Sequence, residues 1–260
     1  MEKEIILLKF GGSLITDKKS NEPKINSENI QSIGKILTTK EHNIIIVHGA
    51  GSFGHPIAKK FGIGNGKDNS LEQKDAIKET RRQVRSLNKI FCNSLNENNL
   101  KTETIIPSET METKGPKKIL NFPFSLFDNV LNQGKIPITF GDVTNDKLKG
   151  VDILSGDTLM LELANHYKPL YSIFVMDYPG VFDGDPTNPE SKIYPLINFE
   201  IAKQLREQSH SSKSIDVTGG LSGKIECALE MSKASETWIT NLDALDGFFQ
   251  DKTKGSQVVL

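Results

Sequence analysis

The sequence predicts an α/β fold, a three-layer α/β/α sandwich with a mainly parallel central sheet. Short apolar runs alternate along the chain with longer segments of helical periodicity, and glycine-rich segments follow several of the runs. The run at residues 44–47 is uniformly apolar, which is typical of a parallel strand buried on both faces. Repeated strand–helix units of this kind place helices on both sides of one sheet.

Six apolar runs are predicted to be strands. The first opens the chain at residues 5–10 and is rich in isoleucine and leucine. The second is the run at 44–47, which leads directly into a glycine-rich segment. The other four are residues 101–107, 136–140, 172–177 and 236–242.

Five segments are predicted to be helices. The first covers residues 27–37, where Ile30, Ile33 and Leu37 share one face and Ser27 is a suitable N-cap. The longest covers residues 71–95, with apolar residues at helical spacing, namely Ile77, Val84, Leu87, Phe91 and Leu95. The other three are residues 124–133, which Gly134 ends, 157–164 and 222–232.

Composition limits the classes of function. The chain has 260 residues, 36% hydrophobic and 25% charged, with a net charge of −1, so the net charge gives no electrostatic argument for a nucleic acid or an anionic membrane as partner. Cys92 and Cys227 lie far apart without metal-ligand spacing and suit a reducing compartment. No apolar signal core follows Met1, and no run approaches the roughly 18 apolar residues of a membrane span. These features predict a cytoplasmic protein.

Glycine-rich segments follow the predicted strands. Residues 11–13 follow the first strand, and residues 49–55 (GAGSFGH) follow the second. Glycines let the backbone turn its N–H groups toward an anion, and His55 adds a side chain that can carry a proton near neutral pH. His48 is expected to be a packed, hydrogen-bonded residue with no catalytic role. Because ligands of open α/β sheets bind beyond the carboxyl ends of the strands, we expect a phosphate site there.

Two segments of the chain partly match familiar nucleotide-binding motifs. Gly49, Gly51 and Gly54 fit the dinucleotide fingerprint, with Glu72 at a suitable distance, and this remains a weak alternative. That fingerprint usually follows the first strand of its domain and has no need of His55. Residues 218–224 nearly spell a P-loop, but Thr218 replaces its first glycine and Ile225 stands where a magnesium-binding Ser or Thr belongs.

Taken together, these segments resemble the amino acid kinase superfamily, and within it the isopentenyl phosphate kinase subfamily. Residues 9–13 (KFGGS), Gly156-Asp157, residues 177–186 and residues 218–224 match the motifs of the superfamily along nearly the whole chain. The subfamily resemblance depends on residues 13–18 (SLITDK) and above all on residues 48–55, which end in His55. Tyr178-Pro179 departs from the usual pattern of the family on the nucleotide side.

The resemblance implies a kinase that uses ATP and Mg²⁺ on a single domain covering residues 1–260. Residues of about 1–165 would bind the acceptor and about 166–260 the nucleotide, in a cytoplasmic homodimer. Phosphoryl transfer asks a protein chiefly for positioning and charge neutralisation, so several cations are needed. Mg²⁺ would bind mainly ATP phosphates and water, and no protein ligand for it is predicted.

The implied site residues have distinct roles. Lys9 and Lys224 would bracket the transferring group, Lys18 would hold the terminal phosphate of the donor, Asp157 would orient Lys9 and Lys224, and His55 would donate to the acceptor phosphate. The predicted acceptor-binding residues are Gly11, Gly12, Gly51, Ser52, Gly54, His55 and Gly156. The predicted nucleotide-binding residues are Lys9, Lys18, Asp177, Gly180, Asp183, Thr218, Gly219, Gly220 and Lys224.

The acceptor itself is left open at this point. Isopentenyl phosphate is the acceptor that the resemblance implies; a phosphonate such as fosfomycin, an amino acid or carbamate are alternatives within the kinase class. A regulatory module that binds nucleotide without turnover is less compatible with an intact set of Lys9, Asp157 and Lys224. Apolar residues at 77–91 and 119–127 could line a pocket for a short isoprenoid tail, although we expect most of them to build the core.

Overall fold

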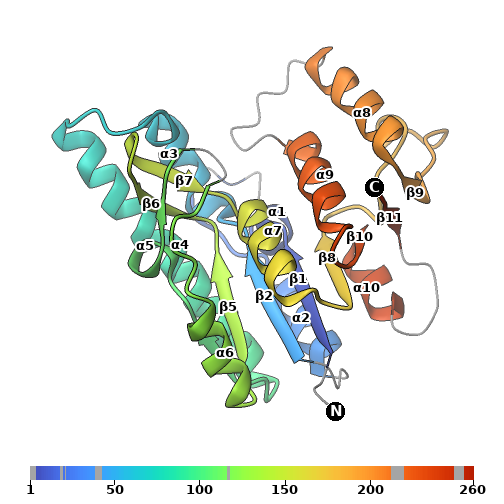
Figure 1. The fold of residues 1–260 in the computed structure, drawn as a ribbon, viewed down its shortest axis with the longest axis horizontal. Coiled ribbons are helices and arrows are strands. Elements are labelled where there is room, and N and C mark those ends of the chain that lie inside the picture. Colours follow the sequence, from blue (N-terminus) through green and yellow to red (C-terminus); the bar gives the residue numbers. More distant parts are fainter. Residues whose placement is uncertain are drawn as a thin grey trace.

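The computed structural model describes residues 4–17, 20, 22–38, 43–115, 118–211, 220–248 and 255–260, with only the backbone of residues 208–211. Figure 1 shows one central sheet with helices in front of it and behind it. The prediction of a three-layer α/β/α sandwich is therefore confirmed.

The central sheet has eight strands in the order β3-β5-β2-β1-β8-β10-β11-β9. All neighbouring pairs are parallel except β10 and β11, which run antiparallel. The first strand in the sequence, β1, therefore lies in the middle of the sheet, and later strands extend the sheet on both sides. The strands are β1 (Ile5–Phe10), β2 (Asn43–His48), β3 (Thr102–Thr104), β5 (Ile136–Phe140), β8 (Tyr171–Val175), β9 (Leu196–Ile197), β10 (Glu236–Thr240) and β11 (Ser256–Val258).

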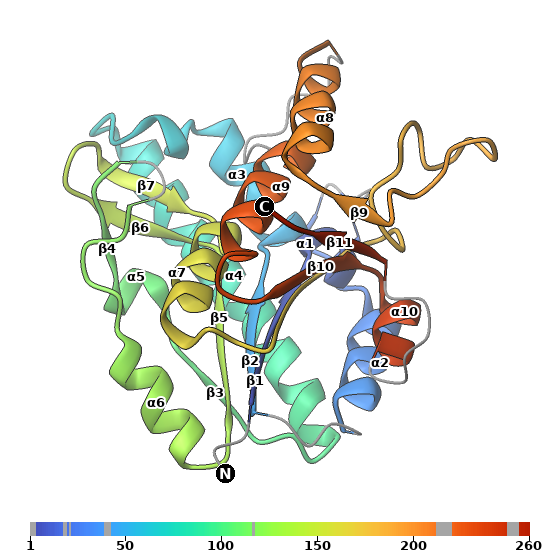
Figure 2. The ribbon, with the colours of Figure 1, turned by 45° about the vertical axis from the view of Figure 1, so that its right-hand side comes forward.

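Two apolar cores, one on each face of the sheet, hold the layers together. Alternate residues of β1 face opposite sides, so Leu8 belongs to one core and Leu7 to the other. The first core contains residues of α1 (Gly12–Ile15), α2 (Ser27–Thr38), α4 (Leu71–Glu97) and α10 (Leu242–Phe248). The second contains residues of α6 (Phe124–Asn132), α7 (Gly156–Tyr167) and α9 (Gly220–Met231), with α8 (Phe199–Ser211) packed against it. Figure 2 shows α8 projecting beyond the sheet.

A second, smaller sheet covers one end of the molecule. It has the order β4-β6-β7, from β4 (Glu112–Thr113), β6 (Asp142–Asp146) and β7 (Gly150–Leu154). Val143, Val151 and Ile153 of this sheet pack on Ala58 of α3 (His55–Lys60) and on the fully buried Ile63. The β6–β7 hairpin therefore forms a wall beside the long helix α4.

The main predicted elements are present, with differences at their ends. The strand expected at 101–107 stops at Thr104, because Pro107 begins the short helix α5 (Pro107–Thr110). The strand expected at 236–242 stops at Thr240, and Leu242 begins α10. The β6–β7 hairpin was not predicted, because Asp142, Thr144 and Asp146 give its first strand a polar composition.

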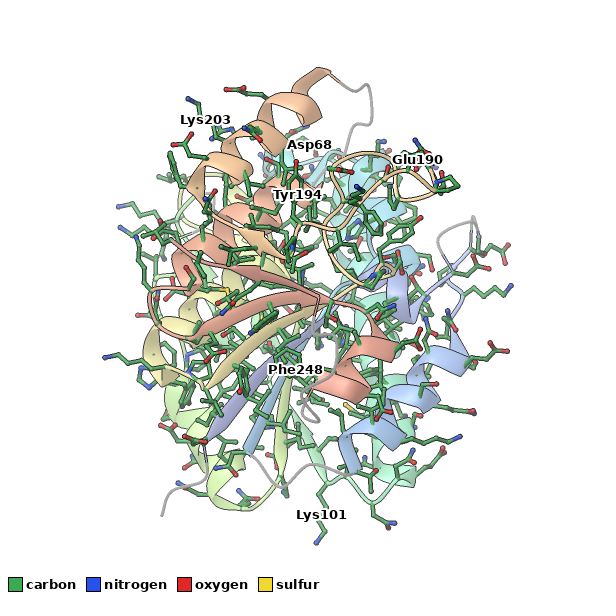
Figure 3. The ribbon with its side chains drawn as sticks, turned by 90° about the vertical axis from the view of Figure 1, so that its right-hand side faces the viewer. Asp68, Lys101, Glu190, Tyr194, Lys203 and Phe248 are labelled. Atoms are coloured by element: carbon green, nitrogen blue, oxygen red, sulfur yellow. The ribbon has the colours of Figure 1, made fainter. Side chains whose placement is uncertain are left out.

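The carboxyl ends of the parallel strands gather at one end of the molecule. Figure 3 shows Lys101, just before β3, at the opposite end from Asp68, which precedes α4. None of the described helices is both long and apolar enough to cross a bilayer.

Candidate active site

Lys9 is placed by the register of three neighbouring strands. In the parallel ladder Lys9 of β1 lies beside Val47 of β2 on one side and Phe174 of β8 on the other. All three side chains belong to the face that α7 and α9 cover, where Val47 and Phe174 are part of the apolar core. Lys9 is therefore only 7% exposed, one residue before β1 ends in the glycine pair.

The first turn of α7 lies directly against Lys9. Ser155 caps this helix by accepting a hydrogen bond from the N–H of Thr158. A Cβ atom on Gly156 would lie 2.9 Å from Cε of Lys9 and 3.3 Å from Cγ1 of Val47. Glycine at 156 therefore allows the helix to approach the strands closely enough for Asp157 to reach the lysine.

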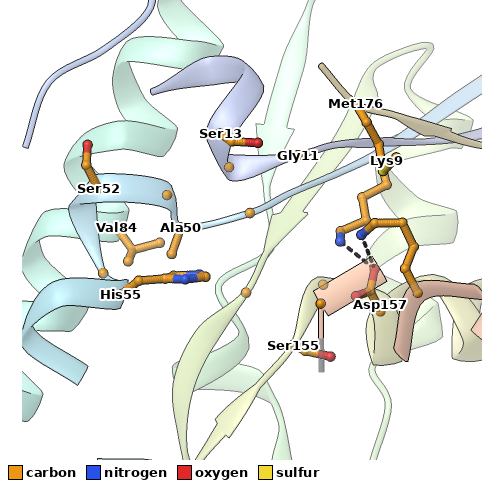
Figure 4. A pocket seen from close by; sticks show the side chains of 18 of the residues that line it. Lys9, Gly11, Ser13, Ala50, Ser52, His55, Val84, Ser155, Asp157 and Met176 are labelled. Carbon is orange, nitrogen blue, oxygen red and sulfur yellow. Dashed lines mark hydrogen bonds and ion pairs between the residues drawn. The ribbon is translucent and has the colours of Figure 1, made fainter. Parts of the chain in front are cut away.

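Asp157 contacts two lysines, Lys9 and Lys224, which are 215 residues apart in the sequence. Its Oδ1 accepts a hydrogen bond from Nζ of Lys9 and another, at 3.4 Å, from Nζ of Lys224 on α9. Both ion pairs are dashed in Figure 4. One carboxylate between two ammonium groups leaves the cluster with one net positive charge, which suits an incoming polyanion.

Burial and neighbouring charge both act on the pKa values of this cluster. Burial raises the pKa of Asp157, but the charges of Lys9 and Lys224 outweigh it and hold that pKa at about 2. Burial lowers the pKa of Lys224 to about 8; the charge of Lys9 also lowers it, and Asp157 counters both. Asp157 is therefore ionised at neutral pH, and Lys224 titrates near the physiological range.

Two glycine-rich loops meet beside the cluster. A Cβ atom on Gly12 would lie 2.4 Å from the backbone N of Gly51, and one on Gly49 would lie 2.6 Å from the backbone N of Gly12. The hydroxyl of Thr16 links the loops, since it donates to the carbonyl of Gly12 at 2.7 Å and accepts from the N–H of Ser52 at 3.1 Å. The loops therefore form one backbone surface between β1 and β2.

A cavity of about 580 Å³ contains these elements. Figure 4 shows His55 reaching into it from the side opposite Asp157, with Ala50 and Val84 beside the imidazole ring. Of the predicted site residues, the cavity brings together Lys9, Gly11, Gly12, Gly51, Ser52, Gly54, His55, Gly156, Asp157, Asp177, Gly220 and Lys224. Residues that are far apart in sequence thus share one concave site, as the strand exits predicted.

Other predicted residues lie elsewhere. Gly180 and Asp183 do not line the cavity: a Cβ on Gly180 would lie 2.7 Å from Oγ of Ser256, and Asp183 accepts a hydrogen bond at 2.8 Å from the N–H of Lys192. In the segment between β8 and β9, Gly180 thus allows close packing, and Asp183 makes a local hydrogen bond. Lys18, Thr218 and Gly219 lie outside the described residues, so their predicted roles stay predictions.

The apolar wall of the cavity was only partly predicted. Val84 of α4 lines it, but Leu87 and Phe91 of the same helix are buried in the core between α4 and the sheet. Phe127 is buried in the core on the other face of the sheet. The structure instead supplies Val143 and Ile153 from the β6–β7 hairpin. Their alternation with polar residues, Asp142 and Thr144 around Val143 and Asp152 before Ile153, is the signal that could have identified this hairpin.

His48 is a core residue, in agreement with its sequence interpretation. It is 0% exposed, and Nε2 lies 3.1 Å from Oδ1 of Asn88 while Nδ1 lies 3.0 Å from the carbonyl of Gly49. Burial lowers its pKa, against the effect of these two hydrogen bonds. The ring stacks on Phe140, with the centroids 5.2 Å apart. His48 thus contacts the glycine-rich loop from the core side, through the carbonyl of Gly49, and does not line the cavity.

Comparisons with known proteins agree with this geometry. The sequence model of the amino acid kinase family matches residues 4–241. The chain belongs to the amino acid kinase family. It is 30% identical over 262 residues to the isopentenyl phosphate kinase of Methanothermobacter thermautotrophicus, covering 98% of this chain and 97% of that protein. It is also 32% identical over 236 residues to the isopentenyl phosphate kinase of Methanocaldococcus jannaschii, covering 85% of each.

Solved structures of amino acid kinases share the fold. A crystal structure of isopentenyl phosphate kinase superposes with a TM-score of 0.82 at 26% identity, covering 97% of this chain and 99% of that one. This agreement extends the family assignment to its isopentenyl phosphate kinase branch. Within the part of the chain that the structure describes, no group of three or more His, Cys, Asp or Glu residues is arranged to hold a metal ion.

Proposed function

We propose that this amino acid kinase transfers the γ-phosphoryl group of ATP to isopentenyl phosphate, which forms isopentenyl diphosphate. The observation that carries the proposal is that one cavity places a cationic Lys–Asp–Lys cluster opposite His55, with glycine backbone between them. Two polyanions could meet across this space, one beside the two lysines and the other beside His55, whose side chain can carry a proton. The family assignment and the named relatives support the same reaction.

Each group in the cavity has a part in the transfer. Lys9 and Lys224 would neutralise the charge that develops on the transferring phosphoryl group, and Asp157 would hold both ammonium groups in place without touching substrate. The N–H groups of the glycine loops would bind phosphate oxygens. Lys18 would hold the terminal phosphate of ATP. Mg²⁺ would enter with ATP, held mainly by phosphates and water, and would neutralise part of their charge.

The apolar wall favours a hydrocarbon tail on the acceptor. Ala58, Val84, Val143 and Ile153 line the cavity on the side of α3, α4 and the β6–β7 hairpin. Contact with such a wall removes apolar surface of the tail from water, whereas fosfomycin, an amino acid or carbamate offers much less apolar surface to bury. Residues of about 1–165 would thus bind the acceptor and about 166–260 the nucleotide, with Lys224 acting from the second half.

We further propose a cytoplasmic homodimer. The dimer follows from the resemblance to the family, and light scattering should give twice the mass of one chain. Cys92 and Cys227 are both buried thiols, which fits a reducing compartment.

His55 provides the test of the acceptor class. A phosphomonoester carries nearly two negative charges at neutral pH, so a charged donor at its binding site offsets its repulsion by ATP. We expect His55→Ala to reduce kcat/KM for isopentenyl phosphate sharply while ATP binding, measured by calorimetry, stays close to that of the wild type. His55→Gln, which still donates a hydrogen bond, should retain part of the activity.

An acceptor panel completes this test. Wild-type protein is assayed for ADP release with isopentenyl phosphate, dimethylallyl phosphate, fosfomycin, glutamate and carbamate. Higher kcat/KM for fosfomycin, glutamate or carbamate than for isopentenyl phosphate would overturn the proposal. So would full activity of His55→Ala on the phosphorylated acceptor.

A further inference from the structure

The two lysines of the cluster share an aromatic ring as well as a carboxylate. Nζ of Lys224 lies over the ring of Phe174, 5.4 Å from its centroid, and Nζ of Lys9 lies 5.7 Å from the same centroid. Both distances are within the range of a cation–π contact, about 6 Å. Phe174 is 1% exposed and contributes to the wall of the cavity.

The position of this ring follows from the sheet. Phe174 is the residue of β8 that pairs in register with Lys9 of β1, and both side chains face α7 and α9. Lys224 comes to the same ring from α9, a different layer of the fold. The ring therefore contacts one ammonium group from each half of the chain.

A ring is chemically suited to this place. Two ammonium groups on one carboxylate oxygen repel each other, and a second carboxylate would remove the positive charge that phosphates need. The negative face of an aromatic ring attracts cations but carries no net charge and binds no phosphate. It can hold both lysines while leaving their charge available to ATP.

We propose that Phe174 is a positioning residue, whose ring holds the ammonium groups of Lys9 and Lys224 in the geometry and the charged state that phosphoryl transfer requires. The catalytic part of this inference rests on the proposed kinase function, whereas the contact with the lysines does not. The competing explanation is that Phe174 is an ordinary core residue, since it also packs in the apolar cluster with Phe127 and Ile239.

The protonation of Lys224 separates the two explanations. Its pKa of about 8 lies close to the working range, so a change in its surroundings changes its charge. Among the described residues, the charged groups that face it are Asp157 from α7 and Lys9 from β1; Arg206 of α8 pairs with Glu226 on α9 at 3.0 Å. A cation–π contact favours the charged amine, so weakening it should lower the pKa of Lys224.

The experiment replaces Phe174 by mono-, di- and trifluorinated phenylalanine, which weakens the negative ring face with little change in shape. The same series at Phe127, a fully buried residue of the same core that does not line the cavity, is the control. The acetylation rate of Lys224, followed by mass spectrometry against pH in the substrate-free protein, gives its pKa without any assay of turnover.

We expect the pKa of Lys224 to fall in steps along the Phe174 series, by roughly half a pH unit at full fluorination. With ATP and isopentenyl phosphate, kcat should fall roughly 3- to 10-fold over the same series, and its alkaline limb should move to lower pH. The Phe127 series should change neither quantity.

An unchanged pKa of Lys224 along the Phe174 series would overturn the inference, as would equal shifts in the two series. A shifted pKa with unchanged kcat would overturn the catalytic part. Failure of the proposed function has a different result: wild-type protein would not phosphorylate isopentenyl phosphate, while the labelling measurement would still report on the ring and the lysines.

Discussion

At the scale of single residues, the site depends on a shared charge. The side chain of Asp157 is 12% exposed, and it pairs with the side chains of Lys9 and Lys224, which are 9% and 15% exposed. Each ion in such a place has lost most of its contact with water and depends on its partner. The cluster should therefore behave as one unit in catalysis, although its members come from three different elements of the fold.

Removing one member should disable that unit. Lys9→Ala, Lys224→Ala and Asp157→Asn should each lower kcat by on the order of 10²–10³-fold, because each removes or misplaces charge that the transition state uses. The double variant Lys224→Ala with Asp157→Asn should lose far less than the product of the two single effects. Steady-state kinetics measures all four variants.

An exposed ion pair provides the control for this prediction. Glu230 bonds Lys233 on the surface, and Glu230→Gln should leave kcat unchanged. Near-wild-type kcat in each of the single variants would show that the site has been misplaced.

The pKa of Lys224 predicts the pH dependence of the reaction. Because its pKa is lowered to about 8, Lys224 loses its charge as the pH rises through that value. We expect kcat/KM for ATP to fall above about pH 8, and Lys224→Arg to lose this limb, since a guanidinium stays charged. Initial rates between pH 6 and pH 10 measure this pH dependence. A fall in kcat/KM above about pH 8 that persists unchanged in Lys224→Arg would assign the titration to another group.

At the scale of elements, the close approach of two loops shapes the proposed anion site. Gly51 has a φ of +51°, and a Cβ atom there would lie 2.1 Å from Oγ1 of Thr16. Gly12 and Gly49 face each other at backbone distance. Because backbone cannot rotate out of the way as a side chain can, these positions require glycine for packing alone.

Gly12 and its neighbour Gly11 give a matched pair of variants. In Gly12→Ala the new Cβ would meet the backbone N of Gly51 at 2.4 Å, whereas in Gly11→Ala the nearest atom is 3.5 Å away. We expect Gly12→Ala to lower Tm by roughly 3–10 °C, from the cost of overpacking, and Gly11→Ala to leave it nearly unchanged. Thermal unfolding followed by circular dichroism measures both; equal Tm values would contradict this reading of the loops.

At the scale of the whole molecule, the cluster joins the two proposed halves. Lys9 and Asp157 belong to the first and Lys224 to the second. We therefore expect either substrate to change the surroundings of groups from both halves. We propose that the acceptor occupies the side of α3 and the β6–β7 hairpin, and that ATP occupies the side of α9. Binding should therefore slow local opening on one side at a time.

Amide exchange measures this division. ATP should slow exchange mainly in peptides from residues 166–260, including 220–231, and isopentenyl phosphate mainly in peptides from residues 1–165, including 51–60. A protein with no added ligand and one with inorganic phosphate are the controls. Protection of the opposite halves would overturn the proposed arrangement.

Much of this molecule follows from its sequence alone. Uniformly apolar runs such as residues 44–47 and periodic ones such as 71–95 specify buried strands and covering helices through local chemistry. Because the carboxyl ends of parallel strands share one edge, the order of apolar runs and glycines is enough to assign the exits at Gly11 and Gly51 to one site.

Only the tertiary structure decided which groups meet there. Strand order is a long-range property, so no local pattern indicated that Phe174 would lie beside Lys9 or that Val143 and Ile153 would form the apolar wall. The same holds for charge: the pKa values of Asp157 and Lys224 depend on burial and on partners distant in the chain. Sequence chemistry names the candidate groups, but their protonation and their neighbours arise only when packing brings them out of water and into contact.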